Sequence, residues 1–252
     1  MRFFGLILLI GLQAGLAMAQ GASVEASFRE FEGKTFEVVG PNCFGTALRL
    51  SGFQTTFRGV DGGEFQAFVK LACRKVQNPE PGDIGIFEMR GFAMAHAYIY
   101  LSPELGIDKP GVDYLGKTPI AVKPLASIIY RNLASPECRR YSKDISECSS
   151  DHYYVRCAGL PESQSQRLQD HDRKVLALEN LMASLLEVAV FAPEQAAAVV
   201  EMSERLAELR EDLRGPLVSE ISGDMRSYLT ARIASLEKQI EYFKIKVAAS
   251  LR

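Results

Sequence analysis

The chain has 252 residues, 47% of them hydrophobic, and its 29 basic and 31 acidic side chains leave a net charge of −2. This composition is typical of a globular protein with room for one large domain or two small ones. The basic residues are interspersed with acidic ones, so no stretch has the excess positive charge of a nucleic-acid-binding surface, and we expect no nucleic-acid partner.

Residues 1–19 have the organisation of a secretory signal peptide. Arg2 supplies a positive charge, residues 3–16 are largely apolar, and Ala17-Met18-Ala19 has the small-x-small pattern that signal peptidase cleaves before Gln20. A transmembrane anchor is the alternative, but the apolar run is short for a bilayer and no basic cluster follows it. We therefore predict a secreted or periplasmic protein with no membrane span after signal cleavage.

Residues 20–160 predict an α+β domain. Gly, Pro, aromatic and β-branched residues are frequent, and the segment from His96 to Leu101 alternates in the way of a strand. A helix followed by several antiparallel strands fits this pattern. We expect a helix over 42–50, strands over 83–87, 96–101 and 119–122, and either a strand or a loop entry over 35–40.

The chain has five cysteines, an odd number that in an exported protein implies at least one unpaired thiol or an intermolecular bond. Cys43 is isolated, so we interpret it as the free thiol and expect Cys73, Cys138, Cys148 and Cys157 to form two disulfides. Four cysteines allow three pairings, and the sequence does not choose among them. Zinc binding is the alternative, but the spacing of the last three cysteines matches no usual ligand pair, and we predict neither a metal nor another cofactor.

Residues 161–252 predict a separate, all-α domain. Cysteine is absent there, Gly and Pro are rare, and apolar residues recur at helical spacing. We expect one helix over about 163–191, a second that opens at Pro193 and ends at Gly215-Pro216, and a third that extends almost to the C-terminus. The third keeps a coiled-coil-like seam of Leu229, Ile233, Leu236, Ile240, Phe243 and Val247. These helices form either an intramolecular three-helix bundle or hairpin, or an arm for a homo-oligomer or a partner protein.

Cys43 occupies a position that favours nucleophilic chemistry. It follows Asn42, a good N-cap residue, which places the cysteine at the start of the predicted helix. The N–H groups and dipole at a helix N-terminus favour the thiolate, the nucleophilic form of the side chain. A small buried helix residue is the other interpretation of an isolated cysteine.

Two motifs that follow Cys43 in the sequence favour its interpretation as a nucleophile. Pro81-Gly82-Asp83 opens one predicted strand, and His96-Ala97-Tyr98-Ile99-Tyr100 opens the next. With the cysteine at a helix start, this order resembles the NlpC-type cell-wall endopeptidases, the bacterial branch of the papain-like cysteine peptidases. The resemblance extends from Gly40 to Lys123 and implies a papain-like fold with Cys43 and His96 as a catalytic pair.

The resemblance also implies a third polar residue about a dozen positions after the histidine, where it orients the imidazole. Asp108 stands at that place, although His or Asn is commoner in the family, and a one-residue slip would present Ile107 or Lys109 instead. The residues around the cysteine also differ, since many relatives have Asp-Cys-Ser-Gly where this chain has Asn-Cys-Phe-Gly.

The function that follows from the resemblance is amide hydrolysis in the cell envelope, at a peptidoglycan stem-peptide bond or in another envelope peptide. The alternative is a catalytically inactive envelope-binding or scaffolding protein on the same fold, which works through its helical tail. The two differ in whether Cys43 is a primed nucleophile.

Overall fold

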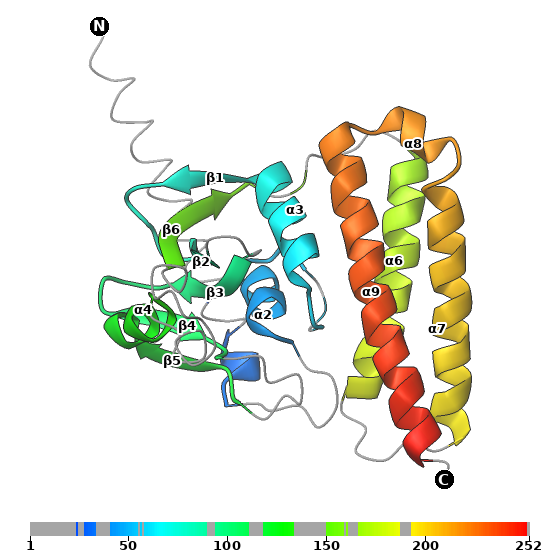
Figure 1. Ribbon diagram of the computed structural model, residues 1–252, viewed down its shortest axis with the longest axis horizontal. Helices are drawn as coiled ribbons and strands as arrows, with labels where there is room; N and C mark the ends of the chain where they lie inside the picture. Colours follow the sequence, from blue (N-terminus) through cyan, green and yellow to red (C-terminus); the bar gives the residue numbers. More distant parts are fainter. Residues whose placement is uncertain are drawn as a thin grey trace, which may run out of the picture.

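The computed structural model describes residues 24, 28–33, 41–54, 56, 58–89, 94–110, 118–133, 150–158, 160, 166–186 and 193–250. It has α+β architecture: a six-stranded antiparallel sheet with helices beside it, followed by long helices that pack together (Figure 1). This confirms the predicted α+β class and the helical second half. The predicted signal peptide over 1–19, the segment 35–40, Cys138 and Cys148 lie outside the described residues.

The sheet has the strand order β1-β6-β2-β3-β4-β5, and every neighbouring pair is antiparallel. The predicted strands over 83–87 and 96–101 are confirmed as β2 and β3, and the strand expected over 119–122 begins two residues later, as β5. The last strand in sequence, β6, pairs between β1 and β2. The bounds are β1 Cys73–Val76, β2 Ile84–Met89, β3 Met94–Tyr100, β4 Leu105–Asp108, β5 Ala121–Pro124 and β6 Ser150–Cys157.

The two faces of the sheet are covered by different helices. Strand residues point alternately to opposite faces, so β2 and β3 each contribute to two hydrophobic clusters. One cluster packs strand residues such as Ile86 and Ile99 against α2 (Cys43–Leu50) and α3 (Gly62–Ala72). The other packs their neighbours on the opposite face against α4 (Leu125–Leu133). This arrangement holds α2 beside β3.

A disulfide joins the two strands at one side of the sheet. Cys73 of β1 and Cys157 of β6 are register partners, and their sulfurs are bonded. The bond pairs two of the four cysteines that we expected to form disulfides. Among the described residues Cys43 is the free cysteine, and it is buried.

The C-terminal half forms a bundle of three long helices: α6 Gln166–Leu186, α7 Pro193–Asp212 and α9 Gly223–Ser250, with the short α8 Leu217–Glu220 before the last. The six seam residues predicted for the third helix are all buried. Five of them form one cluster with apolar residues of α6 and α7. Within the part of the chain that the structure describes, no helix is long and apolar enough to cross a bilayer.

The bundle packs closely on the α+β part. Helix α9 is the bundle helix that lies against α3 (Figure 1), and the ring centroids of Phe68 and Tyr228 are 5.9 Å apart across this contact. The hydrophobic cluster under the sheet includes Leu168, Leu217 and Leu229 from the bundle. The two parts divided in the sequence near residue 160 therefore share one continuous core.

Candidate functional site

Cys43 is the first residue of α2, and its placement depends on Asn42. Asn42 is the N-cap: its side-chain Oδ1 accepts a hydrogen bond from the Gly45 amide at 3.0 Å. This confirms the predicted cap. The cap leaves the Cys43 sulfur at the positive end of the helix dipole, and the cysteine is only 7% exposed.

His96 and Asp108 come from adjacent antiparallel strands. Ile99 of β3 pairs with Ile107 of β4. Continued by one residue, this register places Asp108 opposite Tyr98. Tyr98 and His96 are two residues apart in β3 and share one face of the sheet, so Asp108 lies on that face as well. His96 Nε2 lies 2.8 Å from Asp108 Oδ1, and both side chains are buried. The structure thus brings together the histidine and the aspartate twelve residues later.

Cys43 lies near enough to His96 to change the pKa of the imidazole. Because Nε2 of the imidazole is engaged by Asp108, Nδ1 is the ring nitrogen that can face the sulfur. Burial lowers the pKa of His96, but the charge of a Cys43 thiolate and the hydrogen bonds to Asp108 and Cys43 outweigh burial and raise the pKa to about 9. This environment favours an imidazolium beside the cysteine.

Two cations hold the other oxygen of Asp108. Lys123 of β5 donates to Oδ2 at 3.2 Å, and Arg131 of α4 donates to the same atom. Burial raises the pKa of Asp108, but the hydrogen bond and charge of His96, followed by the charges of Lys123 and Arg131, lower it to about 2. Asp108 is therefore an anion over the whole physiological range, and it stabilises the imidazolium.

The sequence did not point to Lys123 or Arg131. The first lies in a short strand and the second in the last turn of a helix, 15 and 23 residues beyond Asp108. Their contact with the aspartate arises because β4 pairs with β5 and α4 follows directly. The spacing of residues in a single sequence does not reveal such a tertiary contact.

Lys109, the alternative to Asp108 in a slipped register, has a different role. Its ammonium group donates to the Thr118 carbonyl at 2.9 Å, and its side chain is buried. Ile107 is part of the hydrophobic cluster under the sheet. Of the three neighbouring candidates, Asp108 is the one that reaches His96.

The other two histidines lie away from solvent to different degrees. His171 of α6 is 1% exposed and lies 3.4 Å from an Asp212 carboxylate oxygen. His152 stacks on Phe87 with ring centroids 4.6 Å apart. His171 is buried and His152 half-buried, and removal from water lowers the pKa of each.

His152 belongs to an aromatic group beside the candidate site. Its Nε2 lies 2.9 Å from the Tyr98 hydroxyl, which also donates to the Tyr154 hydroxyl. Phe87, on which His152 stacks, pairs with His96 across the strands. The group therefore contacts β3, the strand that carries His96, through Tyr98 and Phe87.

Among the residues that the structure places, no group of three or more His, Cys, Asp or Glu side chains is arranged to hold a metal ion. Comparisons with models of known protein families, with curated proteins and with solved structures find no match to this chain.

Proposed function

We propose that the protein is an exported cysteine hydrolase that cleaves an amide bond of a cell-envelope peptide, most specifically a peptidoglycan stem-peptide bond. The observation that carries the proposal is a buried carboxylate 2.8 Å from Nε2 of a histidine whose pKa is raised by a cysteine at a helix N-terminus. A nucleophile, a base and an orienting acceptor are the parts of a cysteine-protease triad.

The proposed reaction begins with a Cys43 thiolate paired with the His96 imidazolium. The sulfur attacks the substrate carbonyl carbon to form a C–S bond, and the Cys43 backbone N–H stabilises the oxyanion. His96 then donates its proton to the leaving nitrogen as the C–N bond breaks. The neutral imidazole then takes a proton from a water molecule, whose oxygen attacks the thioester carbon; the C–S bond breaks, the acid is released, and the Cys43 thiolate and His96 imidazolium are regenerated.

Three further observations support the envelope assignment. The motif order resembles the NlpC-type endopeptidases and their papain-like fold. The N-terminus has the pattern of a secretory signal. The Cys73–Cys157 bond is of the kind that forms in exported proteins.

The test is hydrolysis of purified envelope peptides. We expect the mature protein to release free amino groups from peptidoglycan fragments, and we expect Cys43→Ser and His96→Ala to release none. Mass spectrometry of each digested fragment identifies the bond that is cut. Absence of amine release by the wild-type protein from intact sacculi, muropeptides and free stem peptides would contradict the proposal.

A non-catalytic binding or scaffolding role is the second candidate, and burial of the site favours it. Cys43 is 7% and His96 5% exposed, so a substrate carbonyl reaches the sulfur only if neighbouring groups move. On this alternative, wild-type protein and Cys43→Ser sediment equally with sacculi and neither releases amines. Tighter retention of a substrate by Cys43→Ser, together with wild-type turnover, supports the hydrolase.

A further inference from the structure

Residues 58–61 form a short segment that lies directly against the start of α2. The Asn42 side chain is bound to the backbone of this segment at both ends: its Nδ2 donates to the Val60 carbonyl at 2.6 Å, and its Oδ1 accepts from the Val60 amide at 3.2 Å. A Cβ atom placed on Gly45 would lie 2.0 Å from the Arg58 carbonyl oxygen, so the two backbones touch. The position of Cys43 therefore follows the position of this segment.

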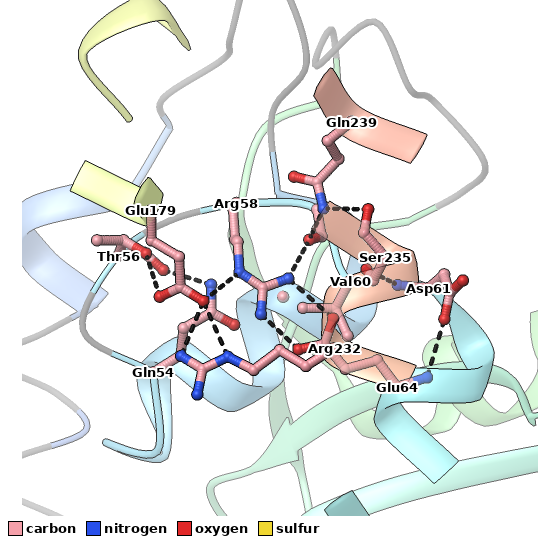
Figure 2. A network of polar contacts seen from close by, with 12 residues as sticks. Gln54, Thr56, Arg58, Val60, Asp61, Glu64, Glu179, Arg232, Ser235 and Gln239 are labelled. Atoms are coloured by element: carbon pink, nitrogen blue, oxygen red, sulfur yellow. Dashed lines mark hydrogen bonds and ion pairs between the residues drawn. The ribbon is translucent and has the colours of Figure 1, made fainter. Parts of the chain in front are cut away.

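The helical bundle holds the same segment from the other side. Helix α9 contributes Ser235, whose hydroxyl accepts from the Asp61 amide at 3.1 Å, and Gln239, whose amide donates to the Gly59 carbonyl at 2.7 Å (Figure 2). Lys238 of the same helix pairs with the Asp61 carboxylate. Residues 58–61 thus form a bridge from α9 to the cap of α2.

A buried ionic cluster fixes this bridge to two bundle helices. Arg58 Nε donates to Glu179 of α6 at 2.8 Å, while its other nitrogens bind Glu64 of α3 (Figure 2). Arg232 of α9 also binds Glu179, at 2.8 Å. The two positive and two negative charges cancel, and the side chains of Arg58 and Glu179 are 2% and 0% exposed.

The charges of this cluster oppose separation of the bundle from the α+β part. Removal of one partner from a buried ion pair leaves an uncompensated charge in the interior, which is strongly destabilising. Separation of the bundle from the α+β part would strip Glu179 from Arg58 and expose a shared hydrophobic core. The geometry does not fit an arm that detaches from the domain.

We infer that the helical bundle is a structural part of the nucleophile site, with Glu179 as a positioning residue that acts on Cys43 through Arg58. Glu179 holds the Arg58 side chain, Arg58 to Val60 holds the Asn42 cap, and the cap sets where the sulfur stands relative to His96. The inference rests on the proposed pairing of Cys43 with His96, and it extends the site to α6 and α9.

The experiment compares alkylation of Cys43 by iodoacetamide at pH 6.5 and pH 9 in the full mature chain. The ratio of the two rates cancels differences in access to the thiol and reports how much thiolate exists at the lower pH. An ordinary thiol gives a ratio on the order of 0.01, whereas a thiolate paired with an imidazolium gives a ratio near one. We expect Glu179→Gln to lower the wild-type ratio at least tenfold.

The matched control is Glu201→Gln, which breaks an exposed ion pair with Arg205 on α7. It should retain the wild-type ratio. Glu179→Gln leaves the buried guanidinium groups of Arg58 and Arg232 without their shared carboxylate. A second variant, Ser235→Ala combined with Gln239→Ala, breaks the contacts between α9 and residues 58–61 and leaves these charges paired. It should also lower the ratio. Circular dichroism at the assay temperature establishes that each variant is folded.

The outcomes separate this inference from the function on which it rests. If His96→Ala leaves the wild-type ratio unchanged, the Cys43–His96 pairing fails. If His96→Ala lowers the ratio while folded Glu179→Gln and the double variant keep it, the pairing stands and the positioning role of the bundle is overturned. A lowered ratio in all three variants, with Glu201→Gln unchanged, supports both.

Discussion

Replacement of Asp108 by Asn removes one negative charge from the candidate site and leaves the shape of the side chain almost unchanged. The amide cannot match the carboxylate as an acceptor for the imidazolium of His96, which now donates to Asp108 Oδ1 at 2.8 Å. Lys123 and Arg131 lose their shared partner, but their side chains are 24% and 42% exposed, so water can solvate them. The main effect therefore falls on His96.

The size of the effect follows from the strength of the lost contact. A hydrogen bond to a charged group contributes about 1.5–3 kcal/mol, and each pH unit of pKa corresponds to about 1.4 kcal/mol. We expect the pKa of His96, about 9 in the wild-type protein, to fall by roughly one to two pH units in Asp108→Asn. If the protein is a hydrolase, kcat should fall by about a hundredfold or more, because a mis-set imidazole impairs both proton transfers.

The assay is an NMR titration of the imidazole signals, which is tractable because the chain has only three histidines. Asp212→Asn is the matched control: it removes the carboxylate beside His171 and should leave the titration of His96 unchanged. An unaltered His96 titration in folded Asp108→Asn would refute the reasoning, because it would mean that the aspartate does not stabilise the imidazolium.

Three other perturbations have defined outcomes. The pKa of Asp108 is about 2 in the folded protein against an ordinary 3.8, so its contribution of roughly 2 kcal/mol to the unfolding free energy is present above pH 4 and lost as pH falls toward 2. In Asp108→Asn the unfolding free energy should fall less steeply with pH over this range. Equal slopes in wild type and variant would contradict the shift. Loss of the Cys73–Cys157 disulfide, which joins residues 84 apart, should lower the unfolding free energy by about 2–4 kcal/mol in urea titrations of Cys73→Ser without reductant, and equal stability of wild type and variant would contradict this. Gly85→Ala should destabilise the sheet by about 1–3 kcal/mol, since its Cβ would lie 2.2 Å from the Tyr98 ring; unchanged thermal stability would show that the ring moves freely.

The parts of the site that the sequence predicted are those set by local rules. Asn42 caps the helix because its side-chain oxygen can accept a hydrogen bond from the unpaired amide of Gly45, three residues later in the first turn. The α+β class and the buried seam of α9 follow from hydrophobic periodicity, which each segment carries by itself. The spacing of His96 and Asp108 came from a resemblance, and the structure brings the two together, while their catalytic role stays a prediction.

The parts that the sequence did not predict depend on contacts between distant segments. Arg58 and Glu179 are 121 residues apart, and neither charge lies in a motif that distinguishes it from solvated neighbours. The burial of His171 has the same origin, since it depends on how α6 packs in the bundle. A division near residue 160, drawn from composition, likewise gave no sign of a core shared between the two halves.

The most direct test of the central claim, that Cys43 and His96 form a primed nucleophile, is the alkylation rate of Cys43 at pH 6.5 relative to pH 9 in wild-type protein and in His96→Ala. We predict a wild-type ratio near one and a ratio on the order of 0.01 in His96→Ala, because an ordinary thiol is about one part in a hundred ionised at pH 6.5. A low wild-type ratio that His96→Ala leaves unchanged would contradict the account and favour a binding or scaffolding protein.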